Sequence, residues 1–255
     1  MTRPGGFPAD QVEPFTSFGD GAGVLLLHGF GGTPASMRPW ADDLVARGYS
    51  VSVPLLPGHG TTWRDLAQVP WTQWYAAADA ALSELRGHGP GPVAVAGLSM
   101  GGCLALRLAA LRPADVSRVM LVNPSMANQN KLMFALPLIR RFMPSIPNDG
   151  PFVKKPGVPR ASYERLPLKA VQSMTGLWKD TRGRLPQVGR PVLLFRSVAD
   201  GPSGEHSGAI VLGGVGSAVR REVLLHDSYH LATLDNDNGL IFAESARFLS
   251  GDAEG

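Results

Sequence analysis

Short apolar runs alternate with longer amphipathic segments along most of this chain of 255 residues. Such short aliphatic runs are typical of strands buried on both faces, and the segments between them have helical length and spacing. Strands that alternate with helices form βαβ units, which predicts a mostly parallel sheet with helices on both faces. The strands are predicted at Val24–Leu27, Tyr49–Val53, Val93–Ala96, Val119–Val122, Val192–Phe195 and Glu222–Leu225. The helices are predicted at 34–48, Trp71–Leu85, Gly101–Leu111 and Ile241–Leu249.

The start of the first helix carries its own signals. Thr33 is a residue type that favours the N-cap position, and Pro34 after it suits the first helical residue. Gly48 is the expected C-terminal stop of the same helix. We therefore expect the Thr33 side chain to cap a single helix that runs from Pro34 to Gly48.

The composition excludes several classes of protein. The formal net charge is +3, and no segment concentrates about five or more like charges, which disfavours nucleic acid as a partner. The lone Cys103 excludes an internal disulfide and a metal site built from thiolates. No apolar run approaches the roughly 18 residues of a membrane span, and the first residues lack the apolar core of a signal peptide. A cytoplasmic location is expected.

Residues 125–187 interrupt the alternation. They are rich in Pro, Met, Leu and Phe, and the apolar run LMFALPLIRRFM is broken by Pro137. An insertion of this length between two strands is commonly a functional lid. Residues 1–124 and 188–255 are therefore predicted to form the core, and 125–187 a lid or cap. The alternative is a crossover that only covers the sheet.

Ser99 stands in the pattern Gly97-Leu98-Ser99-Met100-Gly101, directly after a predicted strand and at the start of a predicted helix. A sharp strand-to-helix turn holds its serine in a strained backbone conformation and needs small neighbours, which Gly97 and Gly101 provide. The helix N-terminus behind the hydroxyl favours negative charge there. Ser99 is therefore predicted to be a nucleophile. The alternative is an N-capping serine in an ordinary turn.

A serine nucleophile needs a base, and the base needs an acid that orients it. In a fold with this elbow, the acid follows a late strand and the base lies in the loop after the last strand. Asp200 follows the strand at 192–195 and is the predicted acid, with Glu205 and Asp227 as rivals. His230 is the predicted base. His226 ends the last predicted strand and is expected to be structural.

Backbone N–H groups are needed to stabilise the oxyanion of a tetrahedral intermediate. The N–H of Met100, directly after the nucleophile, is one predicted donor. The second is the N–H of Phe30 in the segment LHGFGG, where glycines allow the backbone to approach a substrate closely. The alternative is a plain loop before a helix. No phosphate-binding lysine follows these glycines, so nucleotide binding is not expected.

Three further sets of residues receive structural roles. His59 is expected to lock its loop by hydrogen bonds rather than take part in catalysis. Cys103 is expected to lie in the core. Arg140 and Arg141 are expected to form a solvated face of the insertion.

Five segments together resemble the α/β-hydrolase superfamily, and in particular its small bacterial carboxylesterases and monoacylglycerol lipases. They are LLLHGFGGTP, LLPGHG, VAGLSMGGCLALRLA, RSVAD and DSYHLATLDND, and the resemblance covers about residues 23–249. It implies a triad of Ser99, Asp200 and His230, and a lid where the insertion falls. One departure is that Gly201-Pro202-Ser203-Gly204 follows the acid, where the family usually has two aliphatic residues and a proline.

The triad and the resemblance together imply an enzyme that hydrolyses carboxylic esters through an acyl-enzyme, with neither a metal nor an organic cofactor. Its substrates are expected to be short-to-medium acyl esters and monoacylglycerols, bound in the cap by Phe134, Leu138, Phe142 and Met143. Contact of the cap with a lipid surface is expected to be weak at most, and the protein to be a monomer or homodimer. A thioesterase, a carbon–carbon bond hydrolase and a non-catalytic ligand-binding protein of the same fold stay open.

Overall fold

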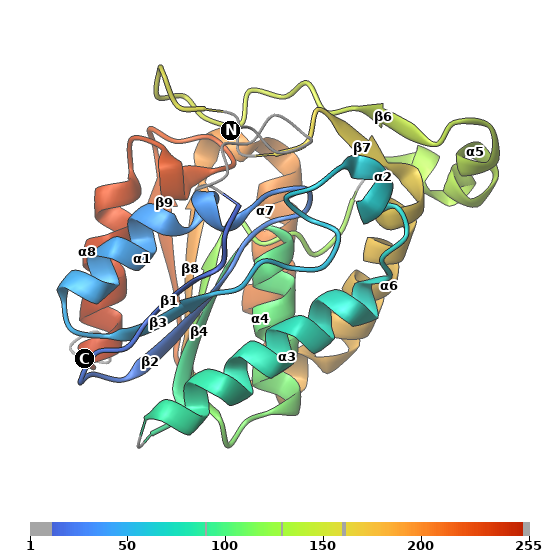
Figure 1. The fold of residues 1–255 in the computed structure, drawn as a ribbon. Helices are drawn as coiled ribbons and strands as arrows, with labels where there is room; N and C mark the ends of the chain where they lie inside the picture. Colours follow the sequence, from blue (N-terminus) through green and yellow to red (C-terminus); the bar gives the residue numbers. More distant parts are fainter. Residues whose placement is uncertain (1–11, 90, 129, 160–161, 252–255) are drawn as a thin grey trace.

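The computed structural model describes residues 12–89, 91–128, 130–159 and 162–251. Within these residues, one sheet has the strand order β1-β3-β2-β4-β5-β8-β9, and its neighbours are parallel except for β1, which pairs antiparallel with β3 (Figure 1). The strands are β1 (Phe15–Ser17), β2 (Gly23–Leu27), β3 (Ser50–Val53), β4 (Val93–Leu98), β5 (Val116–Val122), β8 (Val192–Ser197) and β9 (Arg220–Leu225). The predicted mostly parallel α/β sheet is confirmed.

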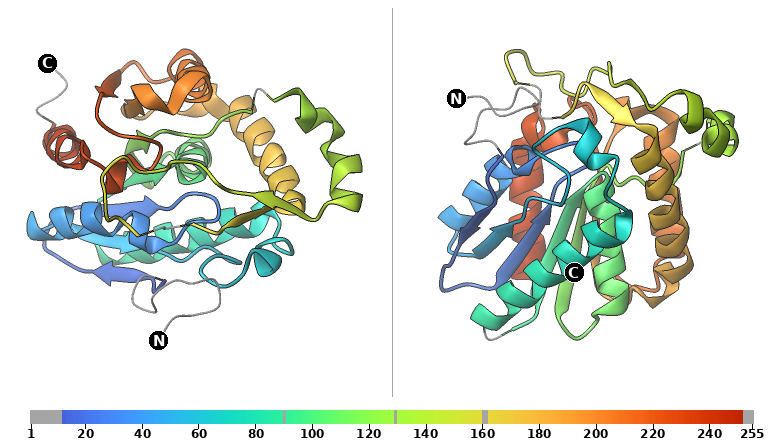
Figure 2. Two further views of the ribbon diagram at one scale, coloured as in Figure 1. Left: turned by 90° about the horizontal axis from the view of Figure 1, so that it is seen from above. Right: turned by 45° about the vertical axis from the view of Figure 1, so that its right-hand side comes forward.

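Helices cover both faces of the sheet (Figures 1 and 2). One face carries α1 (Arg38–Ala46) and α8 (Asn238–Ser250). The other face carries α3 (Trp71–His88), α4 (Met100–Leu111), α6 (Leu168–Arg184) and α7 (Gly201–Gly214). The short helix α2 (Trp63–Leu66) precedes α3. Among the described residues, no helix has both the length and the apolar character needed to cross a membrane.

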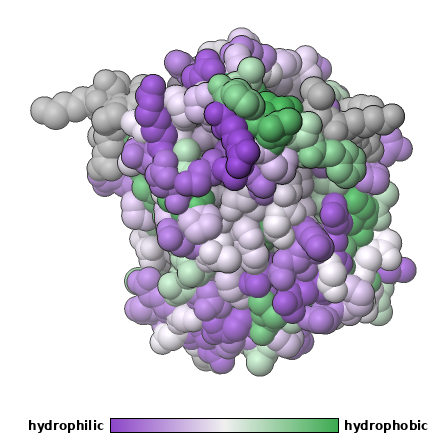
Figure 3. Space-filling view, turned by 90° about the vertical axis from the view of Figure 1, so that its right-hand side faces the viewer, coloured by the Kyte–Doolittle hydropathy of each residue, from purple (hydrophilic) through white to green (hydrophobic). Residues whose placement is uncertain are grey.

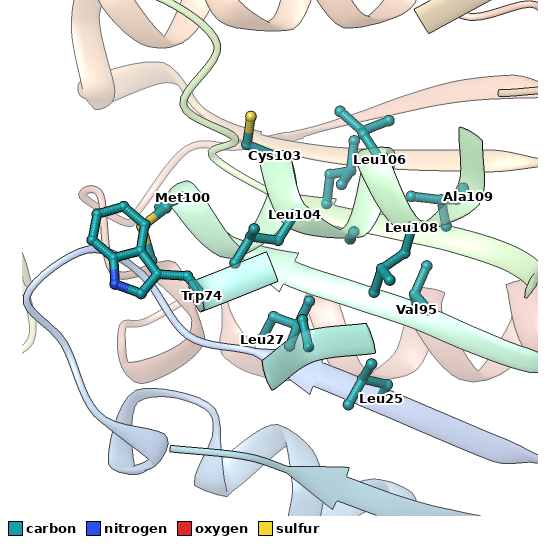
Figure 4. Packing of buried hydrophobic residues seen from close by; sticks show 14 of the residues in the cluster. Leu25, Leu27, Trp74, Val95, Met100, Cys103, Leu104, Leu106, Leu108 and Ala109 are labelled. Atoms are coloured by element: carbon teal, nitrogen blue, oxygen red, sulfur yellow. The ribbon is translucent and has the colours of Figure 1, made fainter. Parts of the chain in front are cut away.

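The core consists of two apolar clusters, one on each face of the sheet. In β2, all of whose residues are buried, Leu25 and Leu27 belong to the cluster under α3 and α4, whereas Val24 and Leu26 belong to the cluster under α1 and α8. This alternation follows from the two-residue period of a strand. Figure 4 shows the first cluster, in which Trp74 and the apolar side of α4 lie over β2 and β4. Burying one such leucine contributes about 1.5–3 kcal/mol.

The first predicted helix is wrong in its start. A 3-10 turn covers Pro34–Ser36, α1 begins only at Arg38, and the Thr33 side chain makes no capping hydrogen bond. The reason is Pro39, the second residue of α1. Proline has no N–H and its ring clashes with the carbonyl four residues before it, so a helix begun at Pro34 cannot continue through Pro39.

The inserted segment divides into two parts with different packing. Its first part contains a 3-10 turn (Lys131–Ala135), α5 (Leu136–Phe142) and a small hairpin of β6 (Ser145–Pro147) with β7 (Arg165–Pro167). Its second part is α6, whose Leu177 and Trp178 lie in the core cluster with α3 and α4. Leu177 and Trp178 therefore tie the second part of the insertion to the core, and the assignment of 125–187 to a cap stays a prediction.

Candidate active site

The sharp turn between β4 and α4 holds Ser99 in a conformation that few residues adopt. Its φ is 55° and its ψ is −116°, and its N–H donates to the carbonyl of Val122 on β5 at 2.9 Å. A Cβ on Gly97 would lie 2.1 Å from the Gly101 carbonyl carbon, and one on Gly101 would lie 2.0 Å from the Leu27 oxygen. Both glycines are therefore required where the sequence predicted small neighbours, because only they let β4, α4 and β2 approach this closely.

The predicted base and acid lie in contact. His230, in the loop after β9, has its Nδ1 2.9 Å from Asp200 Oδ1, and both side chains are partly buried. Because Nδ1 faces the carboxylate, Nε2 is the ring nitrogen left for proton transfer. Asp200 ends a 3-10 turn after β8, and α7 begins directly after it. A Cβ on Gly204 would lie 2.8 Å from Asp200 Oδ2, so the unusual sequence after the acid leaves room for its carboxylate.

The rival residues lie elsewhere. Asp227 is exposed and its carboxylate pairs with the ammonium of Lys154. Glu205 is exposed on α7, and His226 is exposed directly after β9. His230, unlike His226, lines the cavity that contains Ser99, and Asp200 lies 2.9 Å from its Nδ1. The geometry therefore favours Asp200 as acid and His230 as base over each of these residues.

Asp200→Asn is expected to lower kcat by roughly 10³–10⁴-fold with little loss of stability. An amide in place of the carboxylate can donate to Nδ1 of His230, which favours the wrong ring tautomer for proton abstraction. Steady-state kinetics and thermal unfolding of the purified variant give both quantities. Asp227→Asn is the matched control and should keep kcat within about twofold. The acid is misassigned if the control is the inactive variant.

The segment after β2 brings backbone close to the nucleophile. A Cβ on Gly29 would lie 3.4 Å from Ser99 Cβ and 4.0 Å from its Oγ. The turn closes with a bond of 3.1 Å from the N–H of Gly32 to the carbonyl of Gly29, and Gly31 has a φ of +69°. Phe30 lines the cavity beside Ser99. The assignment of the Phe30 and Met100 N–H groups to the oxyanion stays a prediction.

Two buried histidines fix the loop after β2 and the neighbouring segment at Leu56 and Pro57 by hydrogen bonds to the backbone. His28 Nδ1 donates to the Gly29 carbonyl at 3.0 Å, and His28 Nε2 accepts from the Leu56 N–H at 3.1 Å. His59 Nδ1 lies 3.2 Å from the carbonyls of Leu56 and Pro57, in agreement with its expected loop-locking role. Burial lowers the pKa of His28 to about 4, and burial with the nearby His28 lowers the pKa of His59 well below its usual value. Both rings are therefore neutral at pH 7.

Acidification is expected to destabilise the fold between about pH 6.5 and pH 4. In this window the unfolded chain protonates His28 while the folded chain does not, so the free energy of unfolding decreases as the pH falls. The part of this loss that His28 contributes reaches about 3 kcal/mol, and it disappears well above pH 6.5. Urea unfolding measured across this range should give a flatter profile for His28→Gln than for the parent. His206→Gln, at an exposed histidine, should keep the parental slope; an unchanged slope in His28→Gln would contradict the argument.

Ser99 and His230 line one cavity of about 160 Å³. Its wall combines the loop after β2, four residues of the inserted segment, one side chain of α6 and the loop of the base. The lining residues are Gly29, Phe30, Gly32, Ser36, Ser99, Asn148, Phe152, Ser162, Leu166, Met174, His230 and Leu231. The site is therefore small, largely apolar, and partly roofed by the inserted segment.

The predicted acyl-binding residues do not line this cavity. Phe134, Leu138, Phe142 and Met143 lie on or beside α5, which projects from the side of the molecule (Figure 1), and Phe134 and Phe142 are 92% and 84% exposed. The apolar residues that do line it are Phe152, Leu166 and Met174, together with Phe30 and Leu231. The buried side of α5 instead contacts α6 through Leu136, which packs with Leu168 and Val171.

Asp235 links the inserted segment to the loop that carries His230. It is not among the residues predicted from the sequence to belong to the site. Its buried carboxylate accepts backbone N–H groups from Lys154, Lys155, Tyr229 and Asn236 at 2.8–2.9 Å. Burial alone would raise the pKa of this carboxyl, but these donors hold it below its usual value. The available signal in the segment DSYHLATLDND was an aspartate five residues after the predicted base, because a carboxylate that is buried there needs several donors.

Comparisons with known proteins show which family the chain belongs to. Residues 24–244 match the model of a family described as the alpha/beta hydrolase family. The chain belongs to this family. It is 34% identical over 94% of its length to a thermostable monoacylglycerol lipase of Bacillus sp. (strain H-257), of which it covers 94%. It is 25% identical over 93% of its length to a carboxylesterase of Bacillus subtilis (strain 168), of which it covers 96%.

A solved structure supports the same placement of this alpha/beta hydrolase. It comes from work on two metagenome-derived lipolytic enzymes, LipS and LipT, and superimposes with a TM-score of 0.90 at 32% identity. The match covers 98% of this chain and 100% of the other. The resemblance inferred from the five sequence segments is confirmed, and the names of the relatives agree with the prediction of an enzyme that acts on carboxylic esters.

Proposed function

We propose that this alpha/beta hydrolase cleaves short-to-medium acyl esters and monoacylglycerols through an acyl-enzyme. The observation that carries the proposal is that Ser99 and His230 line one apolar cavity while Asp200 binds the far side of the imidazole. This is the arrangement that activates a serine hydroxyl at neutral pH. The activities of the monoacylglycerol lipase and carboxylesterase relatives support the same reaction.

In the first half of the reaction, Ser99 Oγ attacks the ester carbonyl while His230 Nε2 takes its proton. Charge develops on the carbonyl oxygen, which the N–H groups of Phe30 and Met100 stabilise. The bond to the alcohol then breaks, and His230 returns the proton to the leaving oxygen. Asp200 stabilises the imidazolium throughout without accepting the proton itself.

In the second half, water replaces the alcohol. His230 removes a proton from the water as its oxygen attacks the acyl carbonyl, and the bond from the acyl group to Ser99 breaks. The serine regains the proton and the free acid leaves. No proton is gained or lost by the enzyme over the cycle.

The cavity suggests which acyl chains fit. Its volume of about 160 Å³ is below the ~300–1,000 Å³ that holds drug-sized ligands. Each buried methylene contributes about 0.8 kcal/mol, so affinity rises with chain length until the cavity is full. We assign the acyl chain to the side lined by Leu166 and Met174, which packs against the core.

The exposed apolar residues of α5 suit a lipid surface better than an acyl chain. Figure 3 shows hydrophobic side chains gathered on this face of the molecule with hydrophilic ones beside them. Phe134 and Phe142 are exposed, α5 also carries Arg140 and Arg141, and the sequence from Ser125 to Asn148 contains no acidic residue. Aromatic side chains can insert among lipids and basic side chains attract anionic headgroups, so together they favour binding to an anionic lipid surface. We therefore assign weak contact with an anionic lipid surface to α5.

Rates on p-nitrophenyl esters of increasing length, and on monoacylglycerols, test the proposed function. Purified protein is expected to hydrolyse both, with kcat/KM rising from acetate to medium chains. Met174→Ala should lower kcat/KM about tenfold for octanoate, because about 1.4 kcal/mol of apolar contact is lost, but should change acetate by less than about twofold. Phe142→Ala should leave every soluble ester unchanged and slow hydrolysis of monoacylglycerol in anionic vesicles.

Three results would contradict these assignments. Failure to hydrolyse any ester would contradict the proposed function. Equal losses on acetate and octanoate in Met174→Ala would place the acyl chain elsewhere in the cavity. A shift of the soluble-ester optimum in Phe142→Ala would return α5 to the acyl site.

A further inference from the structure

Asn123 lies at the carboxyl end of β5 in a conformation that non-glycine residues rarely adopt. Its φ is 43°, in the left-handed region that asparagine tolerates better than most residues. The side chain is buried, with 1% of the residue exposed. Its own N–H donates to the carbonyl of Phe195 at 2.9 Å, which fixes it against β8. A buried polar residue in a strained position at the end of a central strand indicates a specific function.

The amide of Asn123 binds the two segments that carry the acid and the base. Its Oδ1 accepts from the N–H of Ser197 at 2.8 Å, and its Nδ2 donates to Ser197 Oγ at 2.9 Å. The same Nδ2 donates to the carbonyl of His230 at 2.9 Å and lies 3.4 Å from the carbonyl of Tyr229. Ser197 Oγ in turn donates to the Tyr229 carbonyl at 2.9 Å. One side chain therefore joins the end of β8, three residues before Asp200, to the backbone of the base.

The residues beside Asn123 hold the nucleophile. The carbonyl of Val122 accepts the N–H of Ser99 at 2.9 Å, and the N–H of Ser125 donates to the carbonyl of Ser99 at 3.1 Å. Asn123 thus lies between two backbone bonds to Ser99, while its side chain reaches His230. The segment from Val122 to Ser125 is a direct connection between the nucleophile and the base.

We propose that Asn123, with Ser197, is a positioning residue that fixes the backbone of His230 relative to Ser99. The inference rests on the triad of the proposed function. Asp200 holds the imidazole at Nδ1, and Asn123 holds the backbone carbonyl of the same residue. The site requires one acceptor toward Ser197 and one donor toward His230 at the same side chain, which an amide provides and a carboxylate does not.

The effect of Asn123 on catalysis is expected to come from the distance between the Ser99 and His230 side chains. Proton transfer from Ser99 to His230 needs the two side chains at hydrogen-bonding separation, and a displacement of about 1 Å can cost roughly 100-fold in rate. Asn123 is not among the residues that line the cavity, so its loss should spare substrate binding. The expected signature is a fall in kcat with little change in KM.

Asn123→Gly and Asn123→Asp test the proposal in the full-length enzyme. Glycine accepts the positive φ without strain and removes every side-chain bond, whereas aspartate keeps the acceptor for Ser197 and loses the donor to His230. Both variants are expected to lower kcat about tenfold to 100-fold, with KM within about twofold of the parent. Near-UV circular dichroism and thermal unfolding establish that each variant is folded at the assay temperature.

A second pair of variants keeps the test open if Asn123→Gly does not fold. Ser197→Ala removes the hydroxyl that joins Asn123 to Tyr229 and should lower kcat severalfold. Ser245→Ala is its matched control, since Ser245 is equally buried and loses one bond, to the Ile241 carbonyl within α8. The control should keep the parental kcat.

Two results would overturn the inference. One is a parental kcat in folded Asn123→Gly or Ser197→Ala. The other is an Asn123→Asp variant as active as the parent, which would mean that the donor to His230 has no catalytic effect. Ser99→Ala and His230→Ala, assayed in parallel, distinguish failure of the triad from failure of the positioning role. Activity in these two variants would refute the triad itself. If they are inactive while the Asn123 variants are active, only the positioning role is refuted.

Discussion

Ser99→Ala is expected to remove essentially all ester hydrolysis while the protein stays folded. The hydroxyl is the proposed nucleophile, and alanine offers no atom that can form the acyl-enzyme. Loss of a serine nucleophile costs roughly 10⁶-fold in kcat, and the backbone donors and binding alone still leave roughly 10³–10⁴-fold catalysis over water. Stability should hardly change, because the elbow depends on Gly97, Gly101 and the bond from the Ser99 N–H to Val122.

The measurement is an initial-rate assay on p-nitrophenyl butyrate, with circular dichroism to establish that Ser99→Ala is folded. Freshly purified protein must be compared with a mock preparation that carries no hydrolase, because trace esterase limits the detection of residual rates. Near-parental turnover in Ser99→Ala would remove the basis for the proposed mechanism.

His230→Ala is expected to be about as damaging as Ser99→Ala. Nucleophile and base act as one unit, so the loss of either removes most of the same rate enhancement and the two losses do not add. The double variant Ser99→Ala/His230→Ala should therefore resemble each single variant. His226→Ala is the matched control, because His226 is exposed, lies four residues before the base and does not line the cavity.

The comparison of the two histidine variants is decisive for the base. His226→Ala should keep kcat within about twofold, since surface substitutions away from a site have small effects. If His226→Ala were the inactive variant and His230→Ala retained activity, the base would have to be sought at the end of β9 and not in the loop.

The sequence allowed the sheet and the candidate triad to be located because both depend on local patterns. Apolar runs such as Val93–Ala96 are buried on both faces of a parallel sheet, so their composition identifies them directly. Ser99 and Asp200 each follow such a run, and His230 follows the partly exposed edge strand β9; the carboxyl ends of these parallel strands meet at one edge of the sheet. Their proximity could therefore be expected from strand order alone.

The position of the cap could not be derived in the same way. The apolar content of residues 132–143 predicts that Phe134 and Phe142 contact an apolar partner, but it does not show which surface they face. In α5, Leu136 contacts Leu168 and Val171 of α6 while Phe142 is exposed, and Phe134 is exposed in the turn before α5. Ile146 and Leu166 of the hairpin of β6 and β7 pack against the same cluster, and strands of three residues carry no clear periodic signal.

The hydrogen bonds that support the triad could not be predicted from local sequence patterns either. Asn123 acts through bonds to residues 74 and 107 positions away, and Asp235 through bonds to residues 80 and 81 positions away. No window of sequence contains both partners of such a bond. A polar residue at the end of a buried strand, as in LVNPS, was the available signal for Asn123.

Covalent labelling with a fluorophosphonate tests the central claim most directly. The probe phosphonylates an activated serine, and mass spectrometry of the digested protein locates the adduct. We predict one adduct per chain, on the peptide that contains Ser99, with no labelling of Ser99→Ala and much slower labelling of His230→Ala. An unlabelled parent enzyme that still hydrolyses esters, or an adduct on a different residue, would contradict Ser99 as the nucleophile.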